Sequence, residues 1–164
     1  MPEHARAGLA RSPNAILVSR RRWLGAVVAV AASVARIEGP QASSPASDET
    51  RLRDLINESR RARGLAPLAA SLALDEDARA HSTKLARRQD LFHRSSREFR
   101  RLKVAWIRVG ENVGTAGDVD EMHRLMLASP LHRANVLGDL TAVGIGIERD
   151  RRGRLWVTEL FVAQ

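Results

Sequence analysis

The sequence predicts a single α+β domain that occupies most of the chain. Three observations predict it: helical apolar patterns come first, a glycine-flanked strand lies at 109–115, and two strand-like runs end the sequence. Helices, then a strand, then helices and a C-terminal hairpin give an α+β order, which differs from the regular strand–helix alternation of parallel α/β sheets.

The first two predicted helices cover 49–64 and 72–88. In the first, Leu52 and Ile56 lie on one apolar edge, and a glycine is placed where it would end the helix. Residues 65–68 form an apolar elbow that cannot stay helical through its proline. The second helix repeats apolar residues at helical spacing and carries three acids near its positive N-terminal end.

The second half of the domain predicts two short helices and a hairpin. Asp118 has capping-box spacing to a glutamate three residues later and opens a third helix. Ser129, followed by proline, is expected to be the N-cap of a fourth. The runs 142–149 and 155–163 predict two strands, and the glycine-containing turn at 150–153 predicts that they form a β-hairpin.

Charge and cysteine content exclude several classes of protein. The chain of 164 residues carries a formal net charge of +8, of which five arginines and one glutamate in residues 1–35 supply +4. The remaining charge is spread over a mixed-sign surface with no aromatic-interleaved basic stripe, so we do not expect a nucleic-acid partner. The sequence contains no cysteine. Disulfides, thiolate nucleophiles and cysteine-ligated metals are therefore excluded.

The N-terminus has the pattern of an export signal. Residues 19–24, Ser-Arg-Arg-Arg-Trp-Leu, precede an uncharged apolar run at 24–34 that is too short to span a bilayer. We therefore predict a signal peptide at 1–35 of the twin-arginine type, with a general secretory signal, an uncleaved anchor or a short buried helix as alternatives. Residues 36–49 are rich in proline and serine and predict a flexible linker, which leaves 50–164 as the domain.

This organisation predicts the location of the mature protein. We expect an exported protein, extracellular or in the cell envelope, with no stable membrane anchor after cleavage.

Two of the histidines are expected to be structural or solvated. His81 falls on the apolar face of the second predicted helix, where a buried histidine normally bonds to the backbone. His123 lies among exposed-looking residues of the third predicted helix, so we expect its side chain to be solvated.

Seven short motifs follow one another along residues 50–164. They are Asn57-Glu58-x-Arg60, Gly64-Leu65-x-Pro67-Leu68, Ala80-His81-Ser82, Phe92-His93, Gly110-Glu111-Asn112-Val113, Ser129-Pro130-x-His132-Arg133-Ala134-Asn135 and Val143-Gly144-Ile145-Gly146. Together and in this order they resemble the bacterial branch of the CAP superfamily, which comprises cysteine-rich secretory proteins, antigen 5 and pathogenesis-related proteins and is also called the SCP domain.

The resemblance implies a fold and a site. The fold would be a three-layer α-β-α sandwich with a mainly antiparallel sheet flanked by helices. The site would be a cleft lined by two histidines and two glutamates, of which His93, Glu111 and His132 match three. The second glutamate falls at Ala128–Ser129 and is missing from this sequence.

Two imidazoles and one carboxylate suit a divalent metal such as zinc, with an open position for water. His93, Glu111 and His132 are therefore the candidate cleft residues and metal ligands. The structural alternatives are that Glu111 fixes a glycine turn by accepting backbone N–H groups and that His132 caps a helix.

Three functions follow from this cleft. The first is a non-enzymatic binding module for a divalent metal, a small molecule or a cell-envelope component. The second is a metal-assisted extracellular hydrolase in which Glu111 or His132 acts as general base. The third is a structural or interaction protein with a vestigial pocket. Neither Ser82 nor Ser129 lies in a nucleophile elbow, so we assign no catalytic residue.

Overall fold

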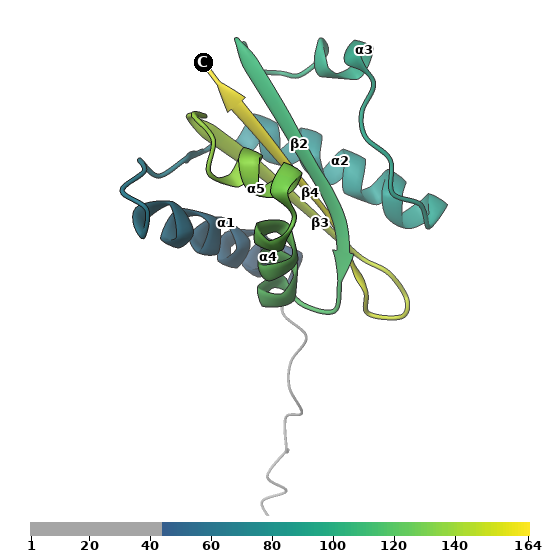
Figure 1. Ribbon diagram of the computed structural model, residues 1–164. Helices are drawn as coiled ribbons and strands as arrows, with labels where there is room; N and C mark the ends of the chain where they lie inside the picture. Colours follow the sequence, from purple (N-terminus) through teal and green to yellow (C-terminus); the bar gives the residue numbers. More distant parts are fainter. Residues whose placement is uncertain (1–43) are drawn as a thin grey trace, which may run out of the picture. The chain divides into compact units, whose positions relative to one another are not determined.

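The computed structural model describes residues 44–164 (Figure 1). The predicted signal peptide, 1–35, and most of the predicted linker lie outside the described residues. The elements of the described part are α1 (Pro45–Arg61), β1 (Ala69–Ala70), α2 (Leu72–Arg88), α3 (Ser96–Phe99), β2 (Arg108–Ala116), α4 (Val119–Ala128), α5 (Pro130–Val136), β3 (Ala142–Arg149) and β4 (Leu155–Ala163).

The four strands form one sheet in the order β1-β3-β4-β2. β1 runs parallel to β3, while β3 and β2 both pair antiparallel with the central strand β4. Figure 1 shows α2 on one face of the sheet and α1, α4 and α5 on the other. The prediction of an α+β fold with helices on both faces of a mainly antiparallel sheet is therefore confirmed.

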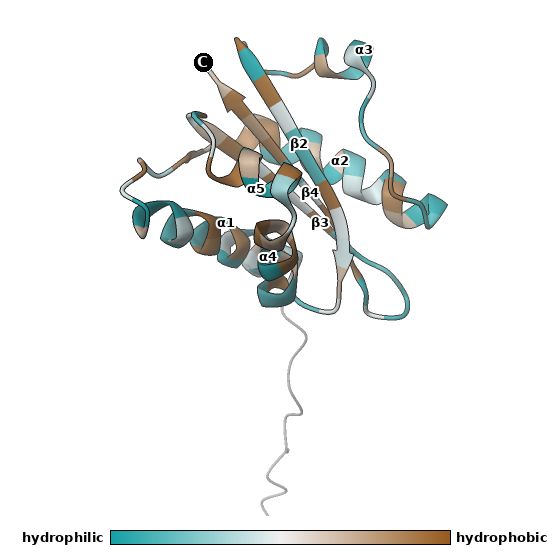
Figure 2. Ribbon diagram, in the orientation of Figure 1, coloured by the Kyte–Doolittle hydropathy of each residue, from teal (hydrophilic) through white to brown (hydrophobic). Residues whose placement is uncertain are grey.

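Each face of the sheet has its own hydrophobic core. On one face, Leu52 and Ile56 of α1 join apolar residues of α4, α5, β3 and β4. On the other, Leu74 and Ala78 of α2 pack against β3 and β4. Hydrophobic and hydrophilic segments alternate along α1 in Figure 2, as expected for a helix with one buried stripe.

The backbone of α2 lies directly against glycines of β3. A Cβ atom added at Gly144 would come within 2.3 Å of the Leu74 carbonyl carbon, and one at Gly146 within 2.2 Å of the Ala78 carbonyl carbon. Real Cβ atoms do not approach backbone atoms so closely. The two glycines are therefore needed for close packing of helix on strand.

Beyond the end of β1, carboxylates from two helices accept hydrogen bonds from the backbone N–H groups on the outer edge of β3. Asp75 accepts a hydrogen bond from the Ile145 N–H (2.8 Å), and Glu49 accepts one from the Ile147 N–H (3.3 Å). Both acids are buried, and Arg53 donates to Asp75 at 2.7 Å. These bonds replace a missing strand, because buried backbone N–H groups need acceptors.

The structure differs from the sequence prediction at the start of the domain. The helix begins at Pro45, inside the range 36–49 predicted as linker, with Ser44 as its N-cap. Asp48 and Glu49 are buried there, and they form ion pairs with Arg149 and Arg79, respectively. Proline and serine, which the prediction assigned to the linker, are here the capping residues of α1.

The prediction for His123 was wrong, whereas Ser129 was correctly predicted as the N-cap residue of α5. His123 is buried rather than solvated, because α4 packs on α1 and brings its Nε2 within 2.8 Å of the Ser59 hydroxyl. Ser129 occupies the N-cap position of α5, yet its side chain makes no capping hydrogen bond. Within residues 44–164, no helix is long and apolar enough to span a membrane.

Candidate functional site

The strand β2 carries two polar side chains that point to opposite faces of the sheet. Glu111 faces the same side as Val113, which packs against Leu85 of α2. Asn112 faces α5 and donates a hydrogen bond to the His132 carbonyl at 3.1 Å. The Gly-Glu-Asn segment therefore lies within a strand, as predicted for 109–115, which rules out the alternative that Glu111 fixes a glycine turn. Successive side chains of β2 point to opposite faces of the sheet, and those at its centre are buried on both faces because helices cover both.

The Glu111 carboxylate is almost completely buried, with 1% of the side chain exposed. Its Oε1 accepts hydrogen bonds from the Arg94 backbone N–H (2.9 Å) and from Nδ1 of His93 (3.1 Å). Its Oε2 accepts from Nη1 of Arg94 at 2.6 Å. Three donors, one of them charged, therefore hold this carboxylate in the structure.

Arg94 anchors the loop between α2 and α3. Its side chain is only 7% exposed, and besides Glu111 it donates to the Asp77 carbonyl oxygen of α2. The guanidinium therefore neutralises the buried Glu111 charge and ties the loop to the helix. A buried ion pair of this kind is tolerated only because hydrogen bonds satisfy both partners.

His93 presents one nitrogen to solvent. An ionised carboxylate can only accept, so Nδ1 of His93 carries the proton that points at Glu111. Nε2 has no hydrogen-bond partner among the described residues, and 57% of the side chain is exposed. Glu111 thus fixes the ring in the tautomer that leaves Nε2 free to accept a hydrogen bond.

His132 approaches the same place from α5. Burial and the nearby His93 both lower its pKa below the ordinary histidine value, with burial as the larger cause. Among the described residues its side chain makes no hydrogen bond, and it makes none to Glu111. The structure therefore brings His93 and Glu111 into contact, while His132 lies near His93 and is neutral at physiological pH.

His81 lies beneath this cluster as a buried structural histidine. Its Nε2–H donates to the Phe92 carbonyl oxygen at 2.9 Å, and its ring packs edge-on against Phe92. Burial lowers its pKa, so it stays neutral although Oε2 of Glu111 is 3.9 Å away. The prediction of a core histidine bonded to backbone is confirmed.

A network of amides and one acid supports the α5 side of the site. Nδ2 of Asn112 donates to Oε2 of Glu159 at 2.8 Å, and Oδ1 of Asn112 accepts from Asn135 at 2.8 Å. Glu159 is fully buried in β4, and its Oε1 has no hydrogen-bond partner. Burial raises the pKa of Glu159 to about 7, while the bond from Asn112 works in the opposite direction. The network connects the centre of the sheet to the helix that carries His132.

The predicted ligand set fits a metal poorly. Both Glu111 oxygens already accept hydrogen bonds, and a divalent cation at this carboxylate would meet the positive charge of Arg94. In residues 44–164, no group of three or more histidine and acidic side chains has the arrangement of a metal site. The two imidazoles are the donors that remain accessible.

Sequence reasoning missed Arg94 and Glu159. Arg94 is one of many arginines, and nothing in the local sequence marks it as the partner of Glu111. Glu159 did carry a signal, because it is the one charged residue in the otherwise apolar strand Leu155–Ala163. Ser82, considered as a nucleophile, is buried and donates to the Gly146 carbonyl oxygen at 2.8 Å, which assigns it to structure.

Known structures share this fold. An extracellular protein from Bacillus anthracis containing an SCP domain is 23% identical, with a TM-score of 0.66 over 73% of this chain and 41% of its own. An outer surface protein from Borrelia burgdorferi is 16% identical, with a TM-score of 0.68 over 74% of this chain and 96% of its own. A cysteine-rich secretory protein from Staphylococcus aureus is 22% identical, with a TM-score of 0.63 over 75% of this chain and 40% of its own.

The chain thus spans about two fifths of the length of the B. anthracis and S. aureus proteins. No curated protein sequence matches it. The sequence model of the cysteine-rich secretory protein family, CAP, matches residues 53–162, which is most of the chain. With the fold and the motif order, this match shows that the chain belongs to the CAP family.

Proposed function

We propose that this chain is an exported, non-enzymatic binding module that contacts a component of the cell envelope. The contact surface consists of the imidazoles of His93 and His132, which we call the two-histidine surface. The observation that carries the proposal is the environment of Glu111: Arg94 neutralises it, so the carboxylate orients His93 instead of reacting or ligating.

Export is supported by two independent observations. The Arg-Arg pattern at 19–24 precedes an apolar run, as in twin-arginine signals. The similar B. anthracis protein is described as extracellular, and the B. burgdorferi protein as an outer surface protein. A component of the cell envelope is the kind of partner that an exported domain would meet.

The chemistry of the surface favours binding through hydrogen bonds. When its ring is neutral, His93 offers an exposed acceptor at Nε2, and the lowered pKa of His132 keeps the His132 ring neutral, so each can pair with hydroxyl or amide groups. Glycan hydroxyls and peptide amides are such groups. The Glu111–Arg94 pair beneath keeps the His93 ring in one orientation, which lowers the entropic cost of binding.

Co-sedimentation of the full chain with purified bacterial cell-wall sacculi tests this proposal. We expect the wild-type chain in the pellet and the double variant His93→Ala/His132→Ala in the supernatant. Arg133→Ala, an exposed change on the same helix, is the control and should sediment like wild type. Equal sedimentation of wild type and double variant, or none for either, would count against the two-histidine surface.

A hydrolase is the second candidate, and one observation favours it. The Glu111–His93 pair leaves Nε2 free, which is the arrangement of a histidine oriented to act as general base. The same sacculi preparation distinguishes the two functions. Release of soluble fragments that disappears in His93→Ala would identify a hydrolase, whereas a binding module releases none.

A further inference from the structure

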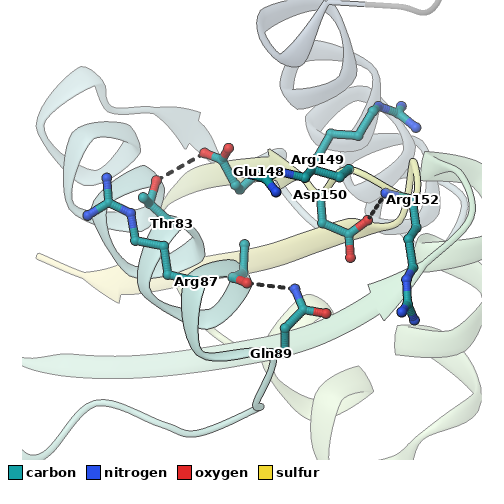
Figure 3. A pocket seen from close by; sticks show the side chains of 9 residues that line it. Thr83, Arg87, Gln89, Glu148, Arg149, Asp150 and Arg152 are labelled. Carbon is teal, nitrogen blue, oxygen red and sulfur yellow. Dashed lines mark hydrogen bonds between the residues drawn. The ribbon is translucent and has the colours of Figure 1, made fainter.

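The turn of the β3–β4 hairpin separates two hollows, and neither His93 nor His132 lines either of them. The first has a volume of about 740 Å³ and is lined by α2 and by the end of β3 with its turn. The second is lined by the end of β2, the start of the β2–α4 connection and the other arm of the turn. Arg152 lines both hollows, so the turn forms a ridge between them. Figure 3 shows the first hollow, with Arg87 and Arg152 pointing away from each other at its two ends.

Arginines dominate the charged lining. The first hollow has four arginines against two acids, namely Arg87, Arg149, Arg151 and Arg152 against Glu148 and Asp150. The second hollow adds Arg154, with one acid, Glu121. No aromatic residue lines either hollow.

The acids that line the first hollow are already occupied by neighbouring donors. Asp150 accepts from the backbone N–H groups of Arg152 (2.9 Å) and Arg154 (3.1 Å) and from the Trp156 indole (3.0 Å). The indole bond is the main cause that lowers the Asp150 pKa, so this carboxylate stays ionised. Glu148 accepts from the Thr83 hydroxyl at 3.1 Å.

Most of the arginines, in contrast, have no partner. Arg149 pairs with Asp48 at 3.0 Å. In the described part of the chain, the guanidinium groups of Arg87, Arg151 and Arg152 make no hydrogen bond or ion pair, and these residues are exposed. The donors to Glu148 and Asp150 are neutral groups and do not cancel the charges of these carboxylates, while Asp48 balances Arg149. By formal charge, the four arginines against the two lining acids and Asp48 leave this hollow an excess of one positive charge, and a concave surface strengthens its potential.

We infer that this ridge and its two hollows bind an anionic polymer that carries phosphate or carboxylate groups along its length. Guanidinium groups bind both anions through paired hydrogen bonds. A single polymer molecule lying across the Arg152 ridge would contact both hollows at once. A polymer with charges spaced along its length therefore suits the site better than one small anion. The missing aromatic lining disfavours single-stranded nucleic acid, which binds by base stacking.

The turn is built to hold its arginines in place. The Asp150 side chain bonds to two backbone N–H groups of the turn, and Gly153 takes the left-handed conformation with φ of 80°. The rigid turn therefore presents the arginines on a fixed backbone, and binding has to order only their side chains.

The test is titration of the full chain with fluorescently labelled inorganic polyphosphate and, separately, with polygalacturonate. The site variant is Arg87→Gln/Arg151→Gln/Arg152→Gln. The control variant, Arg97→Gln/Arg100→Gln/Arg101→Gln, removes the same charge from exposed arginines in and just after α3. Arg152→Gln alone serves as a milder variant, and melting temperatures check that every variant folds.

We expect at least one polymer to bind and its affinity to fall about tenfold or more in the site variant, since charge-assisted hydrogen bonds are lost. The control variant should lose about twofold or less, and Arg152→Gln should lie in between. Binding of polyphosphate but not polygalacturonate would identify phosphate as the ligand group, and the reverse result would identify carboxylate. Binding should persist in His93→Ala/His132→Ala, so this inference does not rest on the proposed function.

Three outcomes would overturn the inference. Equal loss in the site and control variants would show that only net charge matters. Absence of binding to both polymers at about 50 mM salt, where exposed charges are weakly screened, would exclude the site. Tighter binding of a single-stranded oligonucleotide than of either polymer would identify a nucleic-acid surface instead.

Discussion

The buried acid Glu159 makes the stability of this domain depend on pH in an unusual direction. Most carboxylates in folded proteins stabilise the fold when ionised. Glu159 is fully buried, has one bonded and one unbonded oxygen, and its pKa rises from 4.5 to about 7 in the folded state. Replacing it with the neutral isostere in Glu159→Gln therefore removes an ionisation that opposes folding.

The size and sign of the effect follow from proton linkage. Between pH 4.5 and about 7 the folded state holds a proton that the unfolded chain has lost, so stability falls as pH rises through this window. The cost is fully present above pH 7 and absent well below 4.5. At about 1.4 kcal/mol per pKa unit, the cost grows by about 2 to 3 kcal/mol between pH 5 and pH 8.

Urea unfolding of wild type and Glu159→Gln at pH 5 and pH 8 measures this cost. We expect the stability of the variant relative to wild type to be about 2 to 3 kcal/mol higher at pH 8 than at pH 5. In melting temperature this corresponds to roughly 10 °C for a domain of this size. Comparing two pH values cancels the pH-independent effect of the new amide. Glu58→Gln, an exposed change on α1, should show almost no such difference.

A stability difference between wild type and Glu159→Gln that is the same at both pH values would refute the reasoning. It would mean that Glu159 ionises as easily in the folded state as in the unfolded chain. The bond from Asn112 would then balance the effect of burial.

Three further substitutions test the packing and the site. Gly146→Ala should lower the free energy of unfolding, measured by calorimetry, by about 3 kcal/mol, because the added Cβ would lie 2.2 Å from the α2 backbone. Gly117→Ala is the control. It should change stability little, because the nearest atom to its added Cβ is the end of a side chain at 3.3 Å. Asp75→Ala should lower the free energy of unfolding in urea by about 3–5 kcal/mol, because it leaves the Arg53 guanidinium and the Ile145 N–H of β3 unpaired. A loss below about 1 kcal/mol would show that water replaces the carboxylate. His132→Ala should shift the melting temperature by roughly 2 °C or less, because its side chain makes no hydrogen bond to any residue of 44–164. A fall of several degrees would instead make His132 a structural residue.

The sequence was sufficient to predict the elements whose signals are local. The hairpin strands 142–149 and 155–163 were predicted with the bounds that β3 and β4 have, because two mainly apolar runs and the glycine-containing turn between them mark them. The N-cap Asp118 was likewise predicted and does accept from the Glu121 N–H. Such features depend on a few neighbouring residues.

Features that depend on contacts between distant segments could not be predicted from the sequence. The burial of His123 follows from α4 packing against α1, far away in the chain. The neutralisation of Glu111 by Arg94 depends on a loop that folds back onto β2. The family motif correctly brought Glu111 and His93 together, yet it did not indicate which cation balances the carboxylate. That choice changes the chemistry of the site.

Isothermal titration of Zn²⁺ into the metal-stripped full chain tests most directly whether Arg94 takes the place of a metal at Glu111. Wild type should show no one-to-one binding at micromolar affinity, whereas Arg94→Gln, which frees the carboxylate beside His93, should bind Zn²⁺ more tightly than wild type. One-to-one micromolar binding by wild type that is lost in both His93→Ala and Glu111→Gln would contradict the account and establish a metal centre.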